Sequence, residues 1–139
     1  MPISRWNKIF GTKSQYIKED PYNLMSYSLF TKVYSNALNY SDFLSVTKFI
    51  SNKLKIKKNS SILDYGSGNG AILFFFLRKF SLKKNISIEI NKSFLNFQKR
   101  FIKHTKFLKG NFINPSNFLS KIKSNSVDNN TCNSVFQYF

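Results

Sequence analysis

An acidic residue followed by three glycines at alternate positions is the part of this sequence best suited to binding a ligand. Asp64 stands near the end of an apolar run, and Gly66, Gly68 and Gly70 follow. Glycine has no Cβ, so such a loop lets a ligand approach the backbone, and a helix after it presents free N–H groups. The spacing differs from the G-x-G-x-x-G pattern of dinucleotide sites, and the acid would repel a pyrophosphate. The pattern indicates a ligand that is cationic or donates hydrogen bonds.

Further polar side chains are expected where other strands end. Glu89 stands about 20 residues beyond the glycines, where a carboxylate can accept hydrogen bonds from both hydroxyls of a ribose. Asn111 and Asn133 follow two later apolar segments. The carboxyl ends of parallel strands meet at one edge of a sheet, so these residues and the glycine loop are predicted to share that edge. The chain has only 6 acidic residues, which makes a merely solvated role for Glu89 the weaker interpretation.

The elements that must position these residues alternate between strand and helix. Residues 61–65 predict a buried strand, and a helix opens at Gly70 or Ala71 with apolar side chains on most sides. Residues 86–90 alternate in polarity and predict a second strand, and Asn91 is suited to cap the next helix. A third strand around Phe107 and Leu108, one helical turn within 115–122, and a fourth strand from Val127 to about Asn133 complete the pattern. The expected fold is α/β, a Rossmann-like doubly wound parallel sheet.

The segment Ile62–Gly70 resembles the first motif of class I S-adenosylmethionine-dependent methyltransferases. The resemblance covers about residues 55–139, the first half of that fold. It implies S-adenosylmethionine as cofactor and a list of binding residues: Asp64, Gly66, Ser67, Gly68 and Gly70 for the methionine portion, Glu89 for the ribose, Asn111 and Phe112 for the adenine, and Asn133 near the transferred methyl group and its acceptor. The family commonly has aspartate at the position of Asn111, whose amide keeps one acceptor oxygen and adds a donor.

The implied reaction is in-line transfer of the sulfonium methyl group to a nucleophile, with a small molecule as the expected acceptor. No catalytic base and no metal site can be named from the sequence. His104, the single histidine, is expected on the surface near the end of a helix. Cys132 lacks the preceding proline of a cytosine methyltransferase nucleophile and is interpreted as a small buried strand residue.

The formal net charge of +16 raises a second class of function. Clustered lysine and arginine neutralise phosphates, so an RNA-binding or RNA-methylating module is the alternative interpretation. The basic residues are nearly all lysine and are spread along the chain, and AT-rich coding would produce the same composition without a nucleic-acid partner. A small-molecule acceptor therefore remains the favoured partner.

Residues 1–54 are predicted to form a helical segment, with helices over about 21–38 and from Ser41 or Asp42 to Leu54, and with a lid over the pocket as one candidate role. Residues 55–139 would form the first half of the cofactor-binding domain. We expect a fragment of a methyltransferase that exposes an apolar central strand at the sheet edge and binds the cofactor weakly or not at all. A non-catalytic subunit that pairs this open edge in an oligomer is a further alternative.

The sequence contains no apolar run of about 18 residues and no signal-peptide pattern, so no membrane partner is expected. Its single cysteine excludes an internal disulfide. A cytoplasmic location is the default expectation.

Overall fold

The computed structural model describes residues 40–110 and 115–132, with the backbone alone for residues 40–43. The helix expected over 21–38 and its lid role lie outside the described residues, as do Asn111, Phe112 and Asn133. The described elements follow in the order α4 (Tyr40–Lys53), β1 (Ser61–Tyr65), α5 (Ala71–Lys79), β2 (Lys84–Glu89), α6 (Lys92–Phe101), β3 (Thr105–Lys109), α7 (Ser116–Leu119) and β4 (Asn129–Thr131).

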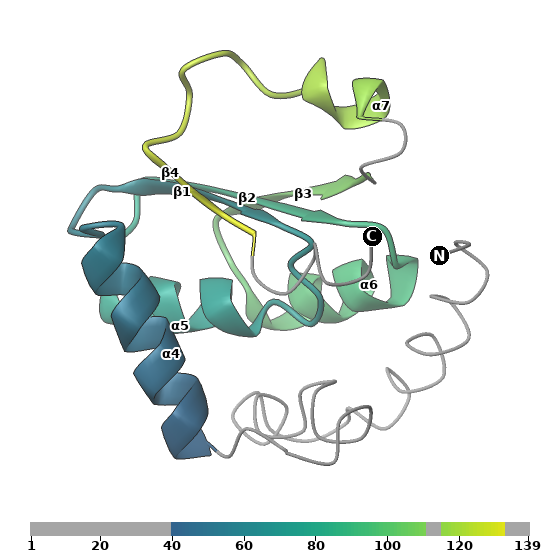
Figure 1. Cartoon of the computed structure of the whole chain (residues 1–139). Coiled ribbons are helices and arrows are strands. Elements are labelled where there is room, and N and C mark those ends of the chain that lie inside the picture. The colour runs from purple at the N-terminus through teal and green to yellow at the C-terminus, as the bar shows by residue number, and fades with distance from the viewer. Residues whose placement is uncertain (1–39, 111–114, 133–139) are drawn as a thin grey trace.

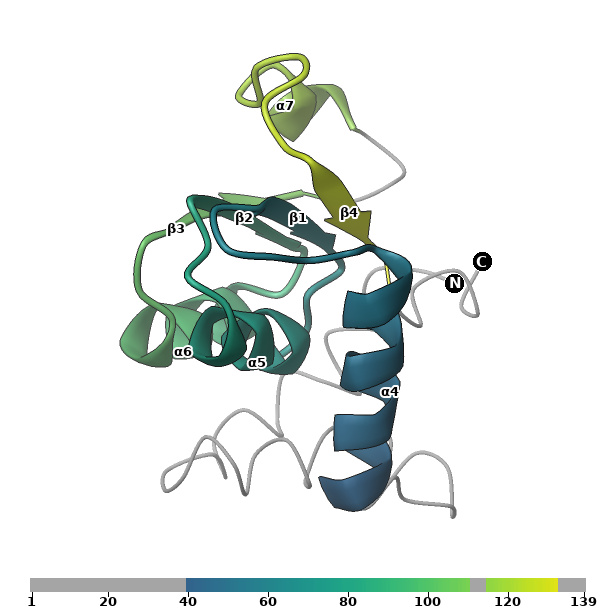
Figure 2. The same cartoon turned by 90° about the vertical axis from the view of Figure 1, so that its left-hand side faces the viewer.

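The four strands form one parallel sheet in the order β3-β2-β1-β4 (Figure 1). Helices α4, α5 and α6 lie on one side of this sheet and α7 lies on the other (Figures 1 and 2). Asn91 caps α6 as predicted, its side chain accepting a hydrogen bond from the backbone N–H of Ser93. The expected Rossmann-like architecture of alternating strands and helices is confirmed.

Two apolar clusters hold the layers together because β1 turns alternate side chains to opposite faces. The cluster on the α5 and α6 side contains Ile62, Leu73, Phe76 and Ile102. The cluster on the α7 side contains Ile86, Ile88, Leu108 and Phe118. Asp64 follows Ile62 by two residues, so the strand directs this carboxyl toward the helical layer.

The central strand β2 is buried on both faces although it alternates in polarity. Ile86 and Ile88 belong to the cluster under α7. Asn85, Ser87 and Glu89 occupy the other face and are also buried. Polar groups in such a position need hydrogen-bond partners, and the partners of Ser87 and Glu89 come from the glycine loop and α6.

The fourth strand is shorter and more polar than expected. β4 spans Asn129–Thr131, whereas Val127 packs beside the second cluster before the strand begins. Asp128 fixes the pairing with β1, because its carboxylate accepts hydrogen bonds from both the backbone N–H and the hydroxyl of Ser61, each at 2.8 Å. The prediction of an apolar strand at this edge is wrong for its described residues.

Helix α4 begins at Tyr40, and Ile50 in its last turn and Leu54 just after its end pack against the first cluster. Phe49, the residue before Ile50, is 61% exposed. None of the helices within 40–110 and 115–132 is long and apolar enough to span a membrane.

Candidate cofactor site

The glycine loop between β1 and α5 is held in a conformation that depends on its glycines. Gly66, Gly68 and Gly70 have φ values of 68°, 57° and 83°, a region that other residues enter at a cost. The N–H groups of Gly66 and Ser67 both donate to the carbonyl oxygen of Ile88, at 2.8 and 3.1 Å. The loop is therefore anchored on β2, and a Cβ on Gly68 would meet no atom within 4 Å. That open side of Gly68 is where a ligand can reach the backbone.

Glu89 links the glycine loop to the start of α6. Its Oε2 accepts a hydrogen bond from Gly68 N at 2.7 Å, and its Oε1 accepts one from Asn91 N at 2.8 Å. Burial raises the pKa of Glu89, and hydrogen bonds from the backbone N–H groups of Asn91, Gly68 and Ile90 oppose that rise. Each carboxylate oxygen can accept more than one hydrogen bond, so the side chain retains capacity for a ligand hydroxyl.

Asp64 lies on β1, the strand next to the one that carries Glu89, and is only 2% exposed. Its Oδ1 accepts a hydrogen bond from the hydroxyl of Thr131 on β4, at 2.7 Å. Burial raises the pKa of Asp64 to about 7; the Thr131 hydrogen bond opposes the rise and the charge of Glu89 adds to it. None of the groups that shift the pKa of either acid is a lysine or arginine. Two buried carboxyls thus lie close enough to interact electrostatically beside an accessible loop, an arrangement that favours a cation.

Gln98 on α6 is a site residue that the sequence analysis missed. Its side chain is fully buried, donates to Ser67 Oγ at 2.8 Å and to the carbonyl oxygen of Gly68 at 2.7 Å, and accepts from Ser87 Oγ at 2.6 Å. Ser67 and Ser87 are also joined directly, at 2.7 Å between their hydroxyl oxygens. Its spacing in the sequence could have predicted its burial, because Gln98 comes four residues after Phe94 and so lies on the apolar face of the helix.

Replacing Gln98 by leucine is expected to lower the free energy of unfolding by about 2–4 kcal/mol. Leucine removes one hydrogen-bond partner from each of two hydroxyls and from a carbonyl, and a buried polar group left unsatisfied costs about 1–3 kcal/mol. Urea unfolding measures the change, and Asn96→Leu at an exposed position of the same helix is the matched control. Equal stability of the two variants would contradict a tethering role for Gln98.

The predicted site residues that the structure describes lie together at the carboxyl edge of the sheet. They are Asp64, Gly66, Ser67, Gly68, Gly70 and Glu89. Gly110, just after β3, donates its N–H to the carbonyl oxygen of Glu89 at 3.3 Å and so reaches the same edge. His104 is exposed and precedes β3 at the opposite edge, as expected of a surface residue.

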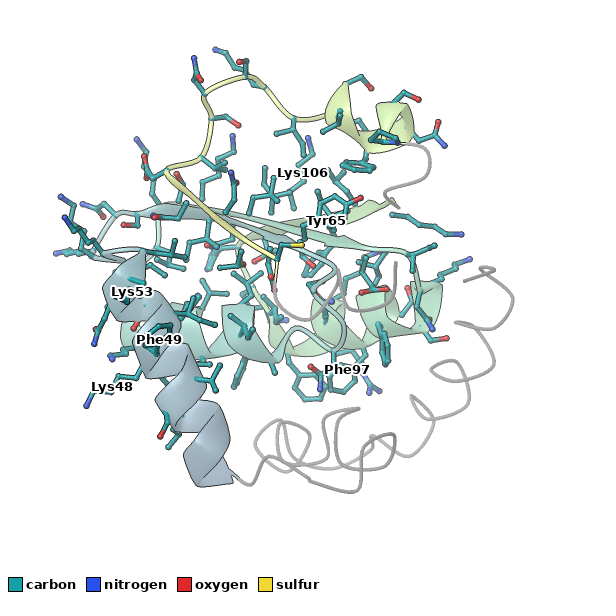
Figure 3. The ribbon with its side chains drawn as sticks, in the orientation of Figure 1. Lys48, Phe49, Lys53, Tyr65, Phe97 and Lys106 are labelled. Carbon is teal, nitrogen blue, oxygen red and sulfur yellow. The ribbon has the colours of Figure 1, made fainter. Side chains whose placement is uncertain are left out.

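Cys132 differs from its predicted place. It follows the last residue of β4 and is partly exposed, so it is not a buried strand residue. Burial and the charge of Asp64 raise the pKa of its thiol. Tyr65 lies at the end of β1 (Figure 3), and the centre of its ring is 5.4 Å from that of Phe118. Burial raises the pKa of its phenol to about 12, which makes the phenol a poor base at neutral pH.

Comparison with solved structures shows which known fold this chain resembles. No protein-family model matches the chain, and no curated protein matches it. Among solved structures, a protein described as an S-adenosyl-L-methionine-dependent methyltransferase from Methanococcus maripaludis is 17% identical over 88% of this chain and 54% of its own, with a TM-score of 0.55. A methyltransferase from Geobacter sulfurreducens, in complex with S-adenosyl-L-homocysteine, is 15% identical over 66% of this chain and 36% of its own, with a TM-score of 0.51.

A precorrin-6y C5,15-methyltransferase from Geobacter metallireducens is also similar, with 15% identity over 63% of this chain and 47% of its own and a TM-score of 0.51. The chain spans between 36% and 54% of the length of these three structures. Identities at this level show the fold alone. The chain has the Rossmann-like fold of the class I S-adenosylmethionine-dependent methyltransferases.

Proposed function

We propose that this chain forms the cofactor-binding part of an S-adenosylmethionine-dependent methyltransferase that acts on a small molecule. The observation that carries the proposal is the pair of buried acids beside the glycine loop. Asp64 is held at a pKa of about 7 and the pKa of Glu89 is raised. A ligand with a positive charge offsets the cost of burying these carboxylates, and S-adenosylmethionine carries both a sulfonium and an ammonium group.

The described residues fit that cofactor in type and place. The open side of Gly68 admits the methionine portion to the backbone, and Asp64 faces its positive charge. Glu89 accepts hydrogen bonds from the ribose while it holds the loop. By their place in the sequence, Asn111 and Phe112 are proposed for the adenine and Asn133 for the region of the acceptor. When bound, the cofactor supplies an electrophilic methyl group, and the chain contributes alignment rather than a named base.

A small-molecule acceptor is supported by the precorrin methyltransferase among the similar structures. Alignment of the acceptor with the methyl group is the chemistry proposed for this fold.

Calorimetric titration with S-adenosylmethionine at about pH 8 tests the proposal. We expect a dissociation constant on the order of 0.1 mM, about −5.5 kcal/mol, because the described contacts come from only part of the fold. Glu89→Gln should weaken binding about tenfold or more through loss of the carboxylate. Asn96→Ala changes an exposed side chain of α6 and serves as the control. Absence of binding up to about 5 mM, or equal affinity of the two variants, would contradict the proposal.

A further inference from the structure

Almost all charge on the described surface is positive. Seventeen lysine and arginine residues have described side chains, and all of them are exposed. The acids with described side chains are Asp64, Glu89 and Asp128, and only Asp128 is exposed, since the other two are 2% and 7% accessible. The fold therefore buries its negative charge at the cofactor site and leaves the positive charge on the surface.

The positive charge is concentrated at the amino edge of the sheet, opposite the glycine loop. Eleven of the seventeen basic residues lie in the connections that lead into β1, β2 and β3, at the first residue of β2, or in the last turns of α4, α5 and α6. Of the remaining six, Lys121 and Lys123 lie in the connection that leads into β4, and the others are Lys48, Lys92, Lys106 and Lys109. In Figure 3, nitrogen-tipped side chains gather at this end of the sheet, beside the end of α4 that carries Lys53. Helix dipoles favour basic last turns, but they do not account for the lysines in the connections.

Aromatic rings lie beneath several of these basic groups. Lys53 Nζ lies 5.5 Å from the centre of the Phe49 ring, and that ring is 61% exposed. Lys79 Nζ lies 5.3 Å from the ring of Phe80 at the end of α5. A positively charged surface with aromatic rings in it can neutralise phosphates and stack bases, which is the combination that binds single-stranded nucleic acids.

We propose that the amino edge of the sheet is a docking surface for single-stranded RNA. An anionic membrane is less suited to this surface because a lipid interface requires a contiguous apolar face. The large apolar side chains exposed in the described chain are Phe49 on α4 and Leu119 on α7, and these helices lie on opposite sides of the sheet (Figure 1). The docking surface and the cofactor site lie at opposite ends of the strands, so the inference does not depend on the proposed function.

The test compares two variants that lose the same charge from different places. The edge variant carries Lys57→Gln, Lys83→Gln and Lys84→Gln, and the control variant carries Lys48→Gln, Lys92→Gln and Lys109→Gln, all at exposed positions. Fluorescence anisotropy with a labelled oligouridine of about 20 nucleotides measures affinity as a function of salt. Far-ultraviolet circular dichroism and urea unfolding confirm that both variants are folded.

We expect the edge variant to bind about tenfold or more weakly at about 0.15 M salt. Its salt slope should fall by up to about 2, since each lost contact with a single strand removes about 0.7. The control variant should lose less than about threefold. Phe49→Leu should weaken binding without changing the salt slope, because it removes stacking but no charge. Equal losses in the two lysine variants, or no binding of RNA by the wild type, would overturn the proposal. Binding to vesicles of phosphatidylcholine and phosphatidylserine that RNA does not displace would overturn it in favour of lipid.

Discussion

Asp64→Asn is expected to remove a large pH dependence from the stability of this protein. Burial raises the pKa of Asp64 from 3.8 to about 7. Between these values the unfolded chain releases a proton that the folded chain keeps, so the free energy of unfolding falls as the pH rises, by at most about 1.4 kcal/mol per pH unit. The stability is fully present below about pH 4, and the loss by pH 7 is on the order of 4 kcal/mol. Asparagine does not titrate, so the variant should not lose stability in this way. Its free energy of unfolding should therefore rise relative to that of the wild type as the pH increases from about 4 to 7.

Urea unfolding of both proteins at about pH 5 and about pH 8 measures the difference, and any constant cost of the asparagine amide cancels in the comparison. Asp128→Asn is a control in which the pH dependence of stability should change in the opposite direction. Hydrogen bonds from Ser61 lower the pKa of Asp128, so that carboxylate stabilises the fold above its normal titration range and loses its effect as the pH falls. Parallel pH profiles for the wild type and Asp64→Asn would show that Asp64 does not titrate as described.

The same substitution should weaken binding of S-adenosylmethionine. In the wild type, affinity is expected to rise between about pH 6 and pH 8 as Asp64 ionises and can face a cation. In Asp64→Asn that rise should be lost, with affinity at least tenfold lower at pH 8, equivalent to about 1.4 kcal/mol. Thr131→Val is the matched variant, because it keeps the carboxyl and removes the hydrogen bond that lowers its pKa. Its rise in affinity should therefore shift to higher pH.

Gly70→Ala is expected to cause the largest loss of stability among single substitutions in the glycine loop. A Cβ at this position would lie 2.5 Å from Ile102 Cδ1 and 2.8 Å from Gln98 Cγ, and φ is +83°. The left-handed backbone costs a non-glycine residue about 1–2 kcal/mol, and overpacking of a filled core adds about 1–3 kcal/mol. We therefore expect a loss of about 2–5 kcal/mol in the free energy of unfolding, measured with urea.

Gly68→Ala is the matched variant at the neighbouring glycine. Its φ of +57° is also left-handed, but the added Cβ would meet no atom within 4 Å. Only the backbone cost of about 1–2 kcal/mol applies, whereas the methyl group enters the space proposed for the cofactor and should weaken its binding about tenfold or more. If Gly70→Ala proves too unstable to study, Gly68→Ala still tests the loop. Equal stability of two folded variants would contradict the packing described around Gly70.

The sequence by itself determined the order of elements and the edge at which the described site lies. The run 61–65, the glycine loop, the alternation of 86–90 and the cap at Asn91 all predicted elements that the structure contains. These signals are local, because side-chain periodicity and turn chemistry act over a few residues. The carboxyl-edge placement of Asp64 and Glu89 then followed from the parallel topology.

Only the tertiary structure decided how the site is held and how the charge is arranged. Gln98 joins Ser67 and Ser87 across 31 and 11 residues of sequence, and Thr131 reaches Asp64 across 67 residues. The polar identity of β4 at its edge and the gathering of lysines at the amino edge likewise depend on which segments the fold brings together. Local patterns carry no information about such pairings, because the hydrogen bonds and the fields that result exist only after the strands and helices have packed.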